Sequence, residues 1–173
     1  MTKKEFFKAV SNAKEDVIQI FLDGLSTADV SYCVIGGLAV NAYTEPVVSL
    51  DLDIVVAIND LETACKAVEG NFKIERFAHS INLGSNKSDL RIQLQIDHRY
   101  QNFISRAVIH SVLGYDMKVA NVEDVLQGKI WAYSDEQRRK SKRQKDLADI
   151  IRLIETYPHL VNQLPDPMRK IVE

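Results

Sequence analysis

The sequence predicts an α/β (α+β) protein, with a mixed β-sheet flanked by helices and a helical C-terminal part. Three observations predict this class. Segments of helical periodicity alternate with short β-branched segments over the first 120 residues. The segment VVSLDLDIVVA (47–57) has the composition of a central strand, and LRIQLQID (90–97) alternates strictly between apolar and polar residues. Helical patterns dominate the rest of the chain.

The remaining elements follow from the same periodicities. Short apolar or β-branched segments predict further strands at 32–36, 72–78 and 115–120. Apolar residues at helical spacing predict helices at 3–25, 36–43, 59–68, 99–112, 121–131 and 145–157. Pro46 and Pro158 stop two of these helices. The turn-rich segment INLGSNKSD (81–89) is expected to be a loop or an edge hairpin.

Length and composition are those of one folded domain. The 173 residues are 46% apolar, which suffices for a core within a single domain over 1–173. We expect the core to lie at about 30–120 and a helical part to follow at about 121–173. A formal net charge of −2 argues against sequence-blind coating of nucleic acid.

Other features of the composition indicate a cytoplasmic protein. Cys33 and Cys65 lie in apolar segments without the spacing of metal ligands, so we expect reduced core thiols. The N-terminal segment MTKKEFFKAV lacks the apolar centre of a signal peptide. No apolar run approaches the roughly 20 residues that span a bilayer, so no membrane partner is expected. The four histidines are scattered and form no zinc motif.

Two aspartates stand within the apolar strand 47–57. Residues two apart on a strand point to the same face, so Asp51 and Asp53 can ligate the same divalent ion. Burial of either carboxylate costs several kcal/mol unless a cation compensates it. Oxygen ligands of this kind suit Mg²⁺ together with substrate phosphates, although a nearby lysine could compensate the charge instead.

A pair of glycines marks the junction between the preceding strand and helix. Gly36 and Gly37 would let the backbone approach a ligand closely, and free N–H groups at a helix start favour phosphate. The alternative is a tight packing turn without a ligand. A phosphate cradle one short helix before a metal-binding strand is what the chemistry of a nucleoside triphosphate requires.

The pattern of hydrophobic-Gly-Gly followed by Ser-x-Asp-x-Asp resembles the signature of the polymerase-β-like nucleotidyltransferase superfamily. Two C-terminal blocks, VANVEDVLQGKIWA (119–132) and RQKDLADIIRLIE (143–155), make the chain similar to bacterial abortive-infection (AbiEii-type) nucleotidyltransferases of type IV toxin–antitoxin systems. This resemblance covers about residues 30–157. It implies nucleotide contacts at Gly36, Gly37 and Ser49, and Mg²⁺ at the catalytic residues Asp51 and Asp53.

The chain departs from the superfamily pattern at two places. Val47 stands where many relatives have an arginine. A third carboxylate is common on a later strand, and here that strand is 90–97, whose central polar residues are Gln93 or Gln95. Asp97 is the candidate for this catalytic carboxylate, and the alternative is that it begins the turn DHRY.

Cations in the C-terminal part have two interpretations each. Lys129, in an apolar helical segment, would bind the triphosphate, or it would pair with Asp146 or Asp149. The segment QRRKSKRQK (137–145) has six cations among nine residues. It is either a solvated basic face or a guide for a phosphate-bearing partner such as tRNA.

These observations predict a Mg²⁺-dependent, ATP- or other NTP-binding nucleotidyltransferase. It would transfer a nucleoside monophosphate to a hydroxyl of RNA, a protein or a small molecule. The resemblance to abortive-infection nucleotidyltransferases implies a cognate toxin or antitoxin as a partner. One alternative is a non-catalytic protein of the same fold that acts by binding a protein partner. Another is an RNA-binding module that uses the face of residues 137–145.

Overall fold

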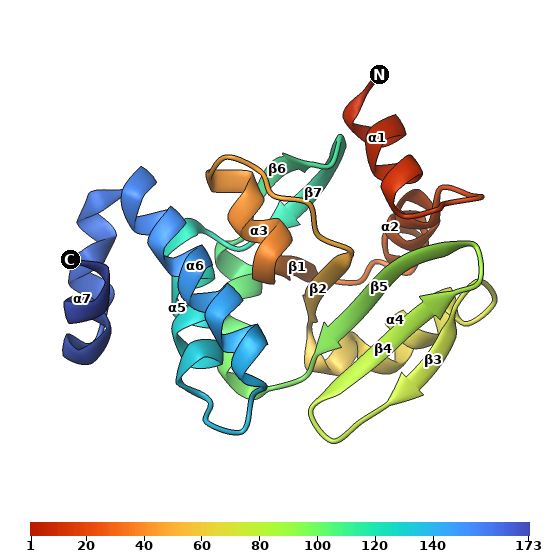
Figure 1. Cartoon of the computed structure of the whole chain (residues 1–173). Coiled ribbons are helices and arrows are strands. Elements are labelled where there is room, and N and C mark those ends of the chain that lie inside the picture. The colour runs from red at the N-terminus through yellow and green to blue at the C-terminus, as the bar shows by residue number, and fades with distance from the viewer.

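A seven-stranded mixed sheet runs through the computed structural model, which describes residues 1–173 (Figure 1). In chain order the strands are β1 (Tyr32–Ile35), β2 (Asp51–Val56), β3 (Lys73–Arg76), β4 (Ser80–Ser85), β5 (Ser88–Gln95), β6 (Val108–Val112) and β7 (Tyr115–Val119). Their order in the sheet is β3-β4-β5-β2-β1-β7-β6. The β2–β5 and β1–β7 pairs are parallel and the other pairs antiparallel, which confirms the predicted mixed sheet.

Helices cover parts of both faces of this sheet. The α-helices are α1 (Lys3–Val10), α2 (Val17–Thr27), α3 (Gly36–Tyr43), α4 (Leu61–Val68), α5 (Val122–Ser134), α6 (Lys140–Thr156) and α7 (Asp166–Val172), and the 3₁₀ helices are η1 (Ile58–Asp60), η2 (His98–Arg106) and η3 (Pro158–Gln163). In Figure 1, α4 lies behind β3–β5, and the paired helices α5 and α6 flank the sheet on the side of α3. No helix is both long and apolar enough to cross a bilayer.

The two faces of the central strands differ in chemistry. Leu52 and Ile54 of β2 share one face with Ile92 and Leu94 of β5, and all four are buried in the apolar core. The opposite face of β2 carries its two aspartates. Because the side chains of a strand alternate, the apolar packing of one face fixes the direction in which the aspartates point.

The predicted single helix at 3–25 is wrong, because the structure has two helices there. Ser11 ends α1, and Asn12 adopts a positive φ of 49°. Asp16 then begins α2 by accepting a hydrogen bond from the N–H of Gln19. Local capping therefore interrupts a segment whose apolar spacing continues on both sides.

The predicted helix at 99–112 is also wrong in its second half. Residues 98–106 form the 3₁₀ helix η2, and β6 follows as the edge strand of a hairpin with β7. Leu113 and Gly114 both have positive φ, at 56° and 85°, as a two-residue hairpin turn requires. The Leu-Gly pair was the sequence signal for this hairpin.

Other boundaries differ by a few residues. The strand expected at 47–57 begins only at Asp51, and the helix expected at 145–157 begins at Lys140. The turn-rich segment 81–89 is the β4–β5 hairpin, the second of the two forms expected for it. Beyond Pro158, the chain adds η3 and α7.

Candidate active site

A cleft of about 280 Å³ opens between the polar face of β2 and β5 and the helices α5 and α6. Five residues predicted for the site line this cleft: Gly37, Ser49, Asp51, Asp53 and Lys129. Gly36 lies beside Asp53 in an adjoining hollow. Asp97 lines neither space.

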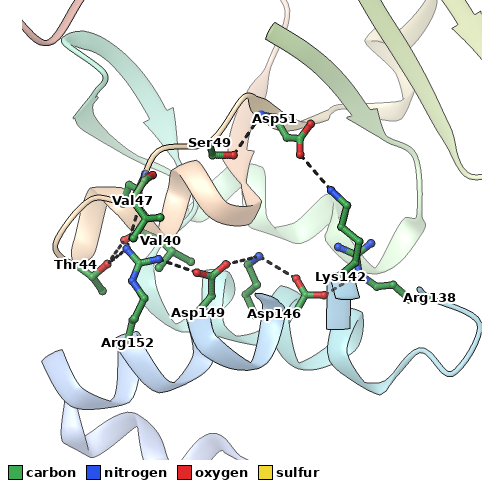
Figure 2. A network of polar contacts seen from close by, with 12 residues as sticks. Val40, Thr44, Val47, Ser49, Asp51, Arg138, Lys142, Asp146, Asp149 and Arg152 are labelled. Atoms are coloured by element: carbon green, nitrogen blue, oxygen red, sulfur yellow. Dashed lines mark hydrogen bonds and ion pairs between the residues drawn. The ribbon is translucent and has the colours of Figure 1, made fainter. Parts of the chain in front are cut away.

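Asp51 is the better compensated of the two β2 carboxylates. Its Oδ1 accepts a hydrogen bond from Arg91 Nε at 2.8 Å, and Arg91 stands directly opposite it on β5. Its Oδ2 lies 3.3 Å from Lys142 Nζ, which reaches across from α6 (Figure 2). The N–H of Asp51 donates to Ser49 Oγ at 3.3 Å, so Ser49 fixes the backbone just before the strand. The alternative that a nearby lysine compensates the charge thus holds for Asp51, although the sequence did not identify Lys142 or Arg91 as its partners.

Asp53 is half-buried and has no hydrogen-bond or ion-pair partner in the protein. Burial raises the pKa of this carboxyl, and the charge of Asp51 adds to the rise. Lys129 is the main cation that opposes the shift, with smaller effects from Arg138 and Lys142. A buried carboxylate without a partner is the feature of this cleft that most calls for a bound cation.

The glycine pair brings backbone close to this carboxylate. Gly36 has a φ of +72°, and a Cβ added to it would lie only 3.1 Å from Asp53 Cγ. Any other residue would be strained and would press on the carboxylate. Gly37 faces the cleft in the first turn of α3, which no side chain caps. The first N–H groups of α3 therefore have no side-chain acceptor.

Lys129 pairs with both aspartates that the sequence offered as its partners, Asp146 and Asp149. Its Nζ lies 3.0 Å from Asp146 Oδ1 and 2.8 Å from Asp149 Oδ2, and only 10% of its side chain is exposed. Arg138 pairs with Asp146 and Arg152 with Asp149, both at 2.7 Å (Figure 2). Burial opposes the charge on Lys129, but Asp149 and Asp146 outweigh it and raise the pKa of the ammonium.

Arg152 fixes the segment that leads into β2. Its guanidinium donates to Thr44 Oγ1 at 2.9 Å (Figure 2). It also donates to Asn41 Oδ1 at 3.0 Å and to the carbonyl of Glu45. The side chain of Asn41 in turn bonds both the N–H and the carbonyl of Val47. Side-chain hydrogen bonds thus hold the segment 44–47, which pairs with no strand, and β2 begins at Asp51.

Asp97 lies at the far end of β5 and caps η2. Its carboxylate accepts from the N–H of Arg99 at 2.9 Å and from the guanidinium of the same residue. The residue that stands opposite Asp53 on β5 is instead Gln93. Asp97 thus begins the turn DHRY, as the alternative interpretation expected. The residue beside the aspartates is the neutral amide Gln93.

Cations of the segment 137–145 divide into two groups. Arg138, Lys142 and Arg143 contact other groups of the chain, since Arg143 donates to the carbonyl of Tyr133. Three exposed cations have no such partner: Arg139, Lys140 and Lys145. Of these, Lys145 lines the cleft. Part of the basic segment 137–145 therefore lines the cleft.

The two aspartates fit a divalent ion that also takes oxygen ligands from substrate and water. Asp53 supplies carboxylate oxygens without an ion-pair partner, and Asp51 lies two residues away on the same face. No cluster of three or more His, Cys, Asp or Glu side chains surrounds them. The donor set is thus too small for an all-protein cage and suits Mg²⁺ bound with phosphates.

Solved structures with similar chain traces settle the fold. The antibiotic-resistance factor ANT(2'')-Ia, in complex with adenylyl-2''-tobramycin, matches with a TM-score of 0.55 at 15% identity over 90% of this chain and 92% of its own. The lincosamide antibiotic adenylyltransferase LnuA, with lincomycin bound, matches at 0.54 and 14% over 80% and 96%. The chain has the nucleotidyltransferase fold.

A third match to this fold is a nucleotidyltransferase from Thermotoga maritima, at a TM-score of 0.54 and 13% identity over 86% of this chain and 96% of that one. No family model matches the sequence, and no curated protein matches it. At these identities, the structural likeness establishes the nucleotidyltransferase fold of the chain and leaves its activity to be argued from the site.

Proposed function

We propose that the protein transfers a nucleoside monophosphate from a nucleoside triphosphate to an acceptor oxygen and releases pyrophosphate. The observation that carries this proposal is Asp53, a half-buried carboxylate without a partner beside Asp51, Gly36 and the uncapped start of α3. Carboxylates for a metal and amides for a phosphate thus meet in one cleft. Mg²⁺, when bound there, would supply positive charge that stabilises the displacement of pyrophosphate.

Different residues would bind the metal, bind the phosphates and position the carboxylates. Asp51 and Asp53 would hold Mg²⁺, and the amides of Gly36 and Gly37 would bind phosphate oxygens. Ser49 would fix Asp51 through its N–H. Lys129 would act on the triphosphate chiefly through its charge, because Asp146 and Asp149 hold its ammonium. Two fold relatives, one in complex with adenylyl-2''-tobramycin and one a lincosamide adenylyltransferase with lincomycin bound, support a small-molecule acceptor.

A second candidate function is non-catalytic binding of a protein partner. The observation that favours it is the pairing of Asp51 with both Arg91 and Lys142, which compensates its charge without a metal. The resemblance to abortive-infection nucleotidyltransferases, carried by residues 119–132 and 143–155, would make that partner a toxin or antitoxin. Against it stands Asp53, which forms no ion pair or hydrogen bond with another side chain of the protein.

Calorimetric titration of each nucleoside triphosphate, with and without Mg²⁺, tests the proposal. Wild type is expected to bind at least one nucleotide only when the metal is present, and the double variant Asp51→Asn/Asp53→Asn is expected to lose this binding. Asp116→Asn removes an exposed carboxylate outside the cleft and serves as the matched control. Absence of metal-dependent binding by wild type would favour the protein-binding alternative.

A further inference from the structure

We propose that the acceptor is an uncharged, hydroxyl-rich molecule longer than one sugar ring, bound over the open face of β3–β5, with one of its hydroxyls donating a hydrogen bond to Asn82. This inference rests on the proposed function and specifies its acceptor. Three properties of that face carry it: a hollow that adjoins the cleft, a buried oxygen without a partner, and charges that are already paired.

A second hollow, of about 630 Å³, lies over β3–β5. In Figure 1, α4 lies behind these strands, and no helix covers their near face. Asn82 and Arg91 line both this hollow and the cleft of the two aspartates. A volume of several hundred Å³ is typical of a site for a small molecule. A ligand in the hollow can therefore extend to the metal-binding carboxylates along one continuous surface.

Asn82 of β4 lies where the two spaces meet and has an unsatisfied oxygen. Its Oδ1 is buried without a hydrogen-bond partner. Such an atom costs stability unless something donates to it, and native proteins leave few atoms in this condition. An amide oxygen accepts hydrogen bonds, so an O–H group satisfies it and a phosphate or carboxylate does not.

Strand pairing places Asn82 in line with the metal-binding carboxylates. Gln93 of β5 stands opposite Asp53, and Asn82 stands opposite Gln93. Neighbouring strands lie about 4.8 Å apart, so Asn82 lies about 10 Å from Asp53 along this row. The hollow continues past Asn82 to Asn71 and Asn86. An acceptor that bonds Asn82 while its reacting hydroxyl meets the nucleotide thus extends beyond one sugar ring.

The charged groups of the hollow favour an uncharged ligand. Two cations and one carboxylate line it, and all three are paired: Lys73 Nζ lies 2.9 Å from Glu75 Oε1, and Arg91 bonds Asp51. An ammonium group on the acceptor would find no free carboxylate there, and an anion would meet the lone pairs of Asn82 Oδ1.

The uncharged groups of the hollow suit alcohols. Besides Asn82, the lining includes the amides of Asn71 and Asn86 and the hydroxyl of Ser85. Each of these groups can both donate and accept hydrogen bonds, as a hydroxyl also does. The carbon stems of Lys73 and Arg91 line the same space and suit the C–H groups of a sugar ring.

The group transfer uses a hydroxyl at the end of the acceptor that reaches the cleft. Its oxygen attacks the α-phosphorus of the nucleotide, the bond between that phosphorus and the β-phosphate oxygen breaks, and pyrophosphate leaves with the bonding electron pair. The proton of the hydroxyl passes to solvent water, and the product is a phosphodiester. Asn82 takes no part in this step, because it holds a different hydroxyl and determines specificity.

Three disaccharides with one scaffold test the proposal: cellobiose, the corresponding disaccharide of glucosamine, and cellobiuronic acid. Each is incubated with the full chain, Mg²⁺ and the α-labelled nucleotide that binds most tightly. Half-maximal labelling of cellobiose is expected at about tenfold lower concentration than that of either charged analogue, as the mismatch of one polar group predicts. Glucose should be labelled less efficiently than cellobiose. Maltose, lactose and trehalose extend the neutral set, so that the stereochemistry of one sugar does not decide the result.

Preferred labelling of the diamine or of the acid would overturn the proposal. Labelling of none of the four neutral disaccharides, by a protein that binds Mg²⁺ and nucleotide in calorimetry, would overturn it as well and leave the nucleotide-binding part of the proposed function standing. If nucleotide binding itself fails, the proposed function is at fault. The two failures are therefore distinguishable.

Asn82→Leu tests the residue behind the inference. It is expected to raise the concentration of neutral disaccharide needed for half-maximal labelling by about tenfold, the effect of one lost hydrogen bond. It should not lower the free energy of unfolding, because it removes an oxygen that is buried without a partner. Asn102→Leu, at an exposed asparagine that lines neither space, is the matched control.

Asn82→Asp keeps an acceptor oxygen at this position and adds a carboxylate without a cation partner. Its preference is expected to shift from cellobiose toward the diamine. Unchanged labelling of every disaccharide in both Asn82 variants would contradict the role assigned to this residue. A loss of stability in Asn82→Leu equal to the loss in labelling would assign the residue to the fold instead.

Discussion

The ammonium of Lys142 on α6 lies 3.3 Å from the carboxylate of Asp51 on β2, so this ion pair spans the cleft. Arg91 bonds the other oxygen of the same carboxylate at 2.8 Å. In the protein alone, cations of the chain thus occupy one of the two carboxylates assigned to the metal. A divalent ion must displace Lys142, Arg91 or both when it binds there.

Lys142→Ala is expected to strengthen metal binding in the absence of nucleotide. A partly exposed ion pair contributes at most about 1 kcal/mol, so its loss should lower the dissociation constant for Mn²⁺ by about twofold to fivefold. Paramagnetic resonance of free Mn²⁺ measures this constant directly. Lys140→Ala removes an exposed lysine without a partner from the same helix, and an equal effect there would mean that only the net charge matters.

Lys129→Met is expected to destabilise the fold. It removes a buried cation from Asp146 and Asp149, and breaking a buried ion pair costs about 3 kcal/mol. Urea denaturation followed by circular dichroism measures the change in the free energy of unfolding. Lys145→Met, at an exposed lysine, should change it by less than about 0.5 kcal/mol. Similar values for both variants would show that Arg138 and Arg152 suffice to compensate the two aspartates.

Gly36→Ala is expected to weaken both the fold and the site. The positive φ costs a non-glycine residue about 1–2 kcal/mol, and the added methyl group would press on Asp53. Thermal unfolding and Mn²⁺ titration would report the two effects separately. Gly70→Ala meets no atom within 4 Å and should leave both unchanged. Full metal affinity in Gly36→Ala would show that Asp53 tolerates displacement.

Tyr115→Phe is expected to destabilise the protein in a pH-dependent way. The hydroxyl of Tyr115 donates to Asp16 Oδ1 at 2.6 Å and ties β7 to the start of α2. Burial opposes ionisation of Asp16, but the hydrogen bonds from Tyr115 and from the N–H of Gln19, with the charge of Lys8, hold the pKa of this carboxyl below its ordinary value. A lowered pKa stabilises the fold above the ordinary value and ceases to do so as pH falls through the folded value.

The difference in unfolding free energy between wild type and Tyr115→Phe should therefore be about 1 kcal/mol at pH 7 and shrink below about pH 4. Chemical denaturation at a series of pH values measures it. Tyr133→Phe removes a hydroxyl that has no hydrogen-bond partner and should show no such dependence. A constant difference at all pH values would assign the effect of Tyr115 to packing alone.

Local periodicity explains why most of the fold could be predicted. The alternation in 90–97 and the apolar run around Asp51 fixed two central strands, because each pattern has only one face that a core can cover. The segment 98–106 shows the limit of this reasoning. Its apolar residues have helical spacing, but the residues form a 3₁₀ helix between a strand and an edge hairpin. Tertiary contacts, which the segment itself does not encode, decide that outcome.

The candidate site likewise contains residues that local sequence patterns predict and residues that depend on the tertiary arrangement. Both aspartates and both glycines follow from a strand period and a strand–helix junction, which are local features. Arg91 faces Asp51 only because β2 and β5 pair in parallel in one particular register. The position of Lys142 depends on how α6 lies across the cleft. Both arrangements depend on contacts between segments distant in the sequence. The cations that compensate Asp51 therefore could not be deduced from the sequence.

The position of Lys129 on α5 and of Lys142 on α6 has a consequence for synthesis of the protein. A ribosome releases β2, with its two aspartates, well before it releases the helices that carry Lys129 and Lys142. Before these helices emerge, Arg91 of β5 is the one partner of Asp51 already released, since Lys142 follows on α6. The cleft is complete only when α6 has left the exit tunnel, because Lys142 and Arg152 line it from that helix.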